Sequence, residues 1–382
     1  MAYLTSRQRV LTALAHEEPD RVPYAIGGGS YGLVDDVYFK LLKLLSLGNP
    51  VEPFRLGHNI SYMDDRLLDR LGTDIRYVYP GDSPSSPNGL TDDPNTFLDG
   101  YGQVWKRAVP YFYADQGILK SATHLDQINQ IVKWPDVNDP RWVKGVAERA
   151  RSLRENTECF ISARMVTSHG PYQTACDLRG TENFMFDMLE NEDFASALLH
   201  RISDTLTGLT HNYLAACGSN VDMIELPGDD YAGNQNLIIS PRLFRKFIRP
   251  ILERMVSTIR AVNPGVKIML HSDGAIEKLI PDFIEIGINV LHPLEPLPAN
   301  DHAKIKQTYG KNIAFIGGID ISHAIPGSLS DVENEVRRRI KLLAANGGYI
   351  LAPSNHIQAD VPAENVVKLC AAAREFGAYP IL

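Results

Sequence analysis

The sequence predicts an α/β protein built as a (β/α)8 TIM barrel, and three observations support this fold class. Eight short apolar segments of strand length alternate with segments of helix length along the 382 residues. Several of these segments end abruptly in titratable side chains followed by glycine or proline, which is typical of buried parallel strands that carry functional groups at their carboxyl ends. The glycine fingerprint of a nucleotide-binding, doubly wound open sheet is absent. The open sheet is therefore the weaker alternative.

The expected strands are apolar runs bounded by turn residues or by helical patterns. They are residues 22–26, 75–79, 160–166, 221–226, 266–270, 288–291, 313–316 and 349–351. A barrel of this kind needs about 250 residues. We therefore expect one domain over residues 1–382, with an N-terminal helical extension and an insertion at about 83–142.

Two segments outside the strands carry local signals. Thr5 and Gln8 form a capping-box pattern that predicts a short N-terminal helix. Three glycines at 27–29 follow the first strand, with a spacing that fits neither GxGxxG nor the Lys-containing phosphate loop. We interpret them as a turn that leaves space for a ligand beside Tyr31. Residues 83–107 are rich in turn residues and end in a hairpin-like alternation. We expect this insertion to cover one end of the barrel and to line the site.

Composition excludes several classes of protein. The formal net charge is −8 and no cluster of Lys and Arg stands out, which argues against a nucleic-acid partner. No apolar run approaches the roughly 18 to 20 residues of a membrane span, and the N-terminus lacks the apolar region of a signal peptide. We therefore expect a cytoplasmic protein. The four cysteines are widely spaced, so neither a disulfide framework nor a sulfur-rich zinc site is indicated.

Polar side chains at the strand ends form the candidate site. His271 and Asp273 follow the run at 266–270, and the pair Asp229 and Asp230 follows the run at 221–226. The other candidates at strand ends are Asp82, His169, His292, Glu295, Asn355 and His356. Because the carboxyl ends of barrel strands meet at one face, we expect these side chains to converge on one pocket.

Two groups of candidates allow more than one interpretation. His271, Asp273 and Glu295 offer nitrogen and oxygen ligands for zinc, but Asp273 also precedes a helix that it could cap. Asp229 and Asp230 are adjacent and point in different directions, so we expect one to face the pocket and the other to hold a loop. The remaining strand-end side chains either bind substrate or are structural groups with satisfied hydrogen bonds.

Five segments together resemble the uroporphyrinogen decarboxylase superfamily. They are TSRQRVLTALAHEEPDRVP near the N-terminus, residues 228–250, HSDGAIEKLIPDFIEIGINVLHPLEP from His271, FIGGID and GGYILAPSNHIQADVPAENV. The superfamily contains uroporphyrinogen decarboxylases and cobalamin-dependent methyltransferases, both on (β/α)8 barrels. The resemblance therefore implies the same fold and an enzyme of one of these two types.

The decarboxylase branch carries an arginine-rich RQAGRY loop that holds the acidic side chains of its tetrapyrrole. Here residues 27–31 read GGGSY and supply no cation to a polycarboxylate substrate. The resemblance matches Asp82 and His356 to decarboxylase positions, whereas Cys176 stands where that branch has a tyrosine. Decarboxylation is therefore the weaker of the two enzyme interpretations.

The methyltransferase branch that uses coenzyme M carries HxC after the fifth strand and a second cysteine near the last strand. These residues bind a zinc ion that activates a thiol. Here the corresponding segments read HSD from His271 and SNH from Ser354. Imidazole and carboxylate ligands suit a zinc ion that binds an oxygen rather than a thiol.

We therefore expect a corrinoid-linked methyltransferase that acts on a small methoxylated or methylated compound. The corrinoid is expected on a partner protein, whereas a zinc ion and a homodimer are both left open. A decarboxylase and a non-catalytic ligand-binding barrel are the alternatives. The expected catalytic residues are His271, Asp273, Asp229, Asp230 and His356. The expected substrate-binding residues are Tyr31, Asp82, His169, His292, Glu295 and Asn355, and the expected metal ligands are His271, Asp273 and Glu295.

Overall fold

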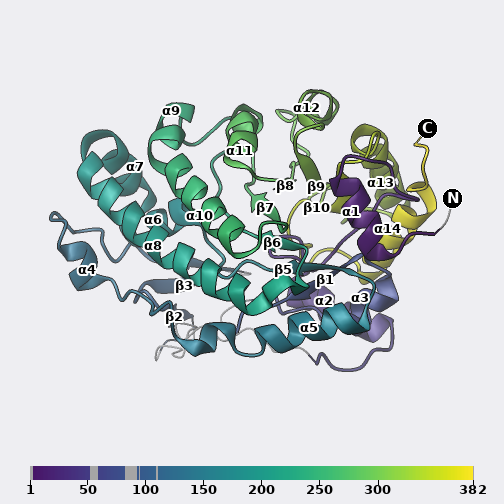
Figure 1. Cartoon of the computed structure of the whole chain (residues 1–382), viewed down its shortest axis with the longest axis horizontal. Helices are drawn as coiled ribbons and strands as arrows, with labels where there is room; N and C mark the ends of the chain where they lie inside the picture. The colour runs from purple at the N-terminus through teal and green to yellow at the C-terminus, as the bar shows by residue number, and fades with distance from the viewer. Residues whose placement is uncertain (1–2, 52–58, 82–92, 94, 109–110, 382) are drawn as a thin grey trace.

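The computed structural model describes residues 3–51, 59–81, 93, 95–108 and 111–381. Its centre is a curled sheet of seven parallel strands surrounded by helices (Figure 1). In their order across the sheet, the strands are β1 (Ile75–Val78), β5 (Phe160–Ala163), β6 (Met223–Glu225), β7 (Lys267–His271), β8 (Val290–His292), β9 (Ala314–Ile319) and β10 (Tyr349–Pro353). Strand order follows chain order, as in a (β/α)8 barrel. The expected fold class is confirmed.

The eighth position of the barrel is filled by an irregular segment instead of a regular strand. Tyr24 pairs in parallel with Leu351 of β10, whose N–H donates to the Pro23 carbonyl at 2.9 Å. On the other side, the Asp74 N–H donates to the Tyr24 carbonyl at 3.0 Å. Proline has no N–H to give to a ladder, so residues 22–26 close the barrel between β10 and β1 without forming the expected strand.

The helices lie around the sheet (Figure 1). They are α1 (Ser6–Leu14), α2 (Asp35–Leu44), α3 (Asp65–Leu71), α4 (Gln127–Ile131), α5 (Val146–Asn156), α6 (Pro171–Arg179), α7 (Thr181–Glu190), α8 (Glu192–Cys217), α9 (Pro241–Leu243), α10 (Arg249–Val262), α11 (Ile280–Ile286), α12 (His302–Tyr309), α13 (Leu329–Leu343) and α14 (Ala363–Phe376). The predicted capping box is present at α1, where Thr5 and Gln8 satisfy each other's backbone N–H. Among the described residues, no helix combines the length and apolar composition that crossing a membrane requires.

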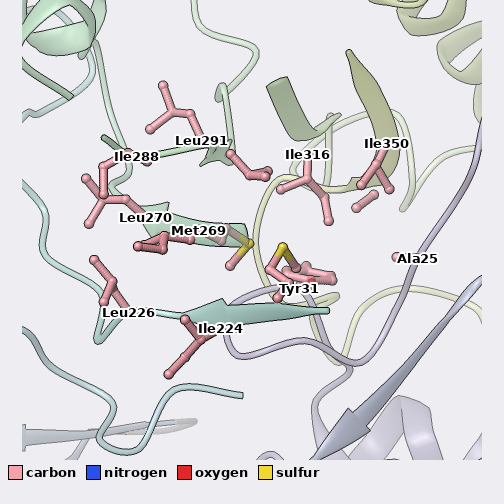
Figure 2. Close-up of a cluster of buried hydrophobic side chains, with 14 of the residues drawn as sticks. Ala25, Tyr31, Ile224, Leu226, Met269, Leu270, Ile288, Leu291, Ile316 and Ile350 are labelled. Carbon is pink, nitrogen blue, oxygen red and sulfur yellow. The ribbon is translucent and has the colours of Figure 1, made fainter. Parts of the chain in front are cut away.

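Branched and sulfur-containing side chains from neighbouring strands fill the core. Figure 2 shows Ile224, Met269, Leu291, Ile316 and Ile350 packed together in this region, and each is at most 1% exposed. The register of β7 and β8 pairs Met269 with Val290 and Leu270 with Leu291. One step further along, it pairs two polar residues at the strand ends, and these begin the candidate site.

The segment that we expected as an insertion contains a small antiparallel sheet in the order β2 (Thr96–Leu98), β3 (Val104–Ala108) and β4 (Tyr111–Ala114). Phe97 pairs with Trp105 across the first two strands, so the predicted hairpin is confirmed. The Trp105 ring lies 5.7 Å from the ring of His169, which follows β5. This contact joins the insertion to the barrel, and its role as a cover for the site stays a prediction.

Candidate functional site

Two histidines at the ends of adjacent strands contact each other. The β7–β8 register places His271 beside His292, and their Nδ1 atoms are 2.7 Å apart. His292 Nε2 lies 3.2 Å from the carbonyl oxygen of Pro353 in β10. Burial disfavours the charged imidazolium. It lowers the pKa of His271, although nearby carboxylates oppose the shift, and lowers the pKa of His292 well below its ordinary value.

Two carboxylates flank the other nitrogen of His271. Its Nε2 lies 3.8 Å from Asp230 Oδ1 and 3.8 Å from Asp273 Oδ2. One ligand atom from each of the three residues falls within 4.8 Å of the others. A single imidazole nitrogen and two carboxylate oxygens that face one point are a ligand set that a divalent cation accepts.

Asp273 is held by one oxygen only. Its Oδ2 accepts a hydrogen bond of 2.6 Å from Asn355 Nδ2, whereas its buried Oδ1 has no hydrogen-bond partner. Burial, with Asp230 and Glu295 nearby, raises the pKa of Asp273 well above its ordinary value. An unsatisfied buried carboxylate oxygen is uncommon in proteins, and it distinguishes Asp273 from Asp229, whose two oxygens both accept hydrogen bonds.

Two expectations for this segment change with the structure. The helix that follows Asp273 is the 3-10 helix η4 (Glu277–Leu279), whose N-cap is Ile276 without a side-chain cap. The capping interpretation of Asp273 is therefore wrong. Glu295 Oε2 accepts a hydrogen bond of 2.8 Å from the Gly274 N–H, and Asp230 stands in the ligand group where we expected Glu295.

Asp229 and Asp230 are adjacent in the chain but make different contacts. The Asp229 carboxylate accepts hydrogen bonds from the N–H groups of Tyr172 and Gln173, at 2.9 and 2.8 Å, and from the Tyr231 hydroxyl at 3.0 Å. It thereby holds the start of α6, although burial raises its pKa to about 7 against the effect of these bonds. Asp229 is only 1% exposed. Asp230 is the member that faces the cluster.

A surface hollow of about 400 Å³ adjoins the cluster. The described residues that line it are Glu295, Ile321, Ser322, Ser354, Asn355, His356 and Gln358. They include no lysine or arginine. His356 Nδ1 accepts a hydrogen bond of 3.0 Å from the Gly32 N–H, which orients the ring at the edge of this hollow. Of the expected strand-end residues, Glu295, Asn355 and His356 line this hollow, and Asn355 connects it to the cluster through its bond to Asp273. The convergence of all the expected residues on one pocket stays a prediction.

The three glycines at 27–29 do not leave space for a ligand. A Cβ at Gly28 would lie 2.0 Å from the Tyr31 ring, and a Cβ at Gly29 would lie 2.6 Å from Glu225 Oε2. Tyr31 is fully buried, bonds to Glu225 Oε1 at 3.0 Å, and packs on His292 with ring centroids 5.0 Å apart. The expected ligand space is occupied by these side chains, and Tyr31 lies behind the histidine pair.

Glu225 is a buried group that sequence reasoning missed. This last residue of β6 accepts hydrogen bonds from the Gly29 N–H at 2.7 Å, from Tyr31, and from the Ser162 hydroxyl at 3.2 Å. Burial raises its pKa, and Arg164 opposes the shift. The available signal was a carboxylate between Ile224 and Leu226, inside the run at 221–226 that we expected to form a buried strand.

The other expected site residues lie around this centre. His169 Nδ1 is 2.6 Å from Asp177 Oδ2. Burial opposes its charged form, but the Asp177 carboxylate outweighs burial and raises the pKa of His169. Cys176, which stands where the decarboxylase branch has a tyrosine, is buried in α6, and burial raises its pKa to about 12. Asp82 lies outside the described residues.

Comparison with known proteins gives the same family from the sequence and the same fold from the structure. A methyltransferase from Methanosarcina mazei superimposes with a TM-score of 0.64 at 22% identity, over 98% of this chain and 99% of that chain. The methylcobamide:CoM methyltransferase MtaA of Methanosarcina barkeri is 26% identical over 209 residues, which are 54% of this chain and 56% of the relative. The chloroplastic uroporphyrinogen decarboxylase of Zea mays is 24% identical over 254 residues, which are 65% of this chain and 59% of the relative.

The match to these curated relatives spans less than two thirds of their own length. The model of the uroporphyrinogen decarboxylase (URO-D) family, however, matches residues 113–376. That match covers well over half of the 382 residues. The chain therefore belongs to the uroporphyrinogen decarboxylase family.

Proposed function

We propose that this chain is a methyltransferase that moves a methyl group from a small methoxylated or methylated compound to a corrinoid carried by a partner protein. The observation that supports it is the cluster of Asp230, His271 and Asp273 at the mouth of the barrel, beside a hollow of about 400 Å³. Cutting the bond between a methyl group and oxygen or nitrogen leaves electron density on that atom. A cation or acid beside the atom stabilises it.

The cluster fits a bound divalent cation. Two ligands of a tetrahedral zinc ion, each about 2.0 to 2.2 Å from the metal, lie about 3.4 Å apart, close to the 3.8 Å between His271 Nε2 and each carboxylate oxygen. Three protein ligands leave a position for substrate, as in catalytic zinc sites. A cation held here supplies Lewis-acid polarisation of the substrate oxygen or nitrogen.

The surrounding residues hold these ligands in place. Asn355 orients Asp273 through its 2.6 Å bond, and Asp230 Oδ1 accepts a 2.8 Å hydrogen bond from the Asp273 N–H. Glu295 fixes the following turn through the Gly274 N–H. The carboxylates are therefore set by contacts between three strand ends, and His356 and Asn355 supply polar groups to a substrate in the hollow.

The same geometry disfavours two other chemistries. The cluster offers no sulfur ligand, so a soft site for thiol activation is not formed. The described lining of the hollow carries no cation, and a tetrapyrrole with many carboxylates would lose its hydration there without compensation. These features favour a small donor with an oxygen- or nitrogen-bound methyl group over uroporphyrinogen.

The test is methylation of free cob(I)alamin with Zn²⁺ and a panel of O-methyl and N-methyl compounds under anaerobic conditions. We expect enzyme-dependent loss of the cob(I)alamin absorbance with at least one donor, and a rate about 10² or more lower for His271→Ala. Glu253→Gln, which removes an exposed carboxylate on α10, is the matched control and should keep the rate. Equal rates for wild type and His271→Ala would refute the proposed site.

A further inference from the structure

We propose that His292 is a positioning residue that keeps the proton of His271 on Nδ1, so that His271 presents an unprotonated Nε2 to Asp230 and Asp273. We had expected His292 to bind substrate. It is 0% exposed, and its two nitrogens face other groups of the protein. The inference rests on the proposed function only in naming the cation that would bind the lone pair of His271 Nε2.

The proton on His292 is fixed by its contact with β10. A backbone carbonyl only accepts hydrogen bonds, so the 3.2 Å contact between His292 Nε2 and the Pro353 oxygen requires an Nε2–H donor. A neutral imidazole carries a single N–H, and a ring that is 0% exposed is held in its neutral form because burial disfavours the charged imidazolium. His292 Nδ1 is therefore an acceptor.

The proton on His271 follows from this assignment. Its Nδ1 is 2.7 Å from His292 Nδ1, and two acceptors would repel at that distance, so the His271 Nδ1–H donates. The remaining lone pair is on Nε2, which faces Asp230 Oδ1 and Asp273 Oδ2 at 3.8 Å. These distances are too long for hydrogen bonds. The unprotonated Nε2 and one oxygen of each carboxylate thus lie within 4.8 Å of one another, an arrangement that suits a divalent cation.

The strands of the barrel hold His271, His292 and Pro353 in fixed positions. The β7–β8 register sets the two rings opposite each other, and Pro353 belongs to β10, so His292 links two non-adjacent strands. The Tyr31 ring packs against His292 at 5.0 Å and is itself bonded to Glu225. Groups of this kind, which orient a metal-binding histidine through its second nitrogen, typically contribute about 10- to 100-fold to metal affinity.

Two substitutions separate the two hydrogen bonds of His292. His292→Asn keeps an acceptor oxygen at the position of Nδ1, whereas His292→Gln reaches toward Pro353 with its amide and loses that acceptor. We expect Zn²⁺ affinity, measured by titration calorimetry, to fall about 10- to 100-fold for Gln and to be largely retained for Asn. Tyr349→Phe, which removes another buried hydrogen bond to a carbonyl, should leave the affinity unchanged. Equal affinities for Gln and wild type, or equal losses for Asn and Gln, would overturn the proposal.

A second measurement reads the proton position in the metal-free wild-type protein and needs a variant only to assign the signals. Long-range proton–nitrogen NMR of the histidine rings in the metal-free wild-type protein reports which nitrogen of His271 is protonated, with His271→Gln used to assign its signals. We expect a protonated Nδ1 and an unprotonated Nε2. A proton on Nε2 overturns the inference. Wild type that binds no Zn²⁺ overturns the metal in the proposed function instead, and the spectrum still decides the proton position.

Discussion

Replacing Asp229 by asparagine tests whether burial controls this carboxylate. Its pKa lies at about 7 instead of the ordinary 3.8, so the folded protein holds this proton more tightly than the unfolded chain does. Stability from this group is therefore fully present below pH 3.8 and is lost as the pH rises through about 7. Asp229→Asn has no proton to lose and removes this dependence.

The size of the effect follows from the shift. One pKa unit corresponds to about 1.4 kcal/mol, and integration of proton binding between pH 5 and pH 8 gives a loss of roughly 2 to 3 kcal/mol in the wild type. Asparagine can satisfy only one of the N–H groups of Tyr172 and Gln173, because its NH₂ faces the other, and this costs about 1 to 3 kcal/mol at both pH values. The pH-dependent part is thus separable from the lost hydrogen bond.

Urea unfolding of both proteins at pH 5 and pH 8, followed by circular dichroism, measures the difference. We expect Asp229→Asn to be less stable than wild type at pH 5 and to recover roughly 2 to 3 kcal/mol relative to wild type at pH 8. Other titrating groups contribute equally to both proteins and cancel. A difference between the two proteins that is the same at both pH values would refute the argument that burial outweighs the three hydrogen bonds.

Three further outcomes are expected. Asp273→Asn should weaken Zn²⁺ binding by at least about 10-fold in calorimetry, since it removes an anionic ligand; unchanged affinity would exclude Asp273 from the site. Gly29→Ala should destabilise the fold by about 1 to 3 kcal/mol in thermal unfolding, because its Cβ meets Met165 at 2.4 Å and Glu225 at 2.6 Å. Gly265→Ala, where the Cβ makes only ordinary contact, is its control. The purified protein should form no coproporphyrinogen from uroporphyrinogen, and robust turnover in that assay would favour the decarboxylase interpretation.

The fold could be predicted from the sequence because apolar runs of strand length and the polar side chains that follow them are local signals. Seven of the eight apolar runs form regular strands. The exception at 22–26 contains Pro23, whose missing N–H was a visible reason to expect an irregular edge. The hairpin in the insertion was readable for the same reason, since alternation and turn residues lie within a few positions of each other.

Side-chain contacts between distant segments could not be predicted from the sequence. Glu225 accepts a hydrogen bond from Tyr31, which lies 194 positions earlier in the chain. The residues next to Glu225 in the sequence give no indication of that partner. The link from His271 through His292 to Pro353 depends on strand register and ring orientation, which a single sequence does not specify. The division of roles between Asp229 and Asp230 could be anticipated, but which residue holds α6 depends on the turn geometry.

Asn355 lies where it can fix one carboxylate oxygen of Asp273, which we proposed as a cation ligand. A carboxylate can rotate and present either oxygen, so a well-defined site needs a partner that fixes one of them. Asn355 bonds the same Asp273 Oδ2 that lies 3.8 Å from His271 Nε2, and it leaves Oδ1 unsatisfied inside the protein. Strand β10 thus contributes at this site through two orienting groups, the Pro353 carbonyl on His292 and the Asn355 amide that follows the strand. The Pro353 carbonyl acts on His271 through His292, and Asn355 acts directly on Asp273, so contacts between β7, β8 and β10 set the geometry of the cluster.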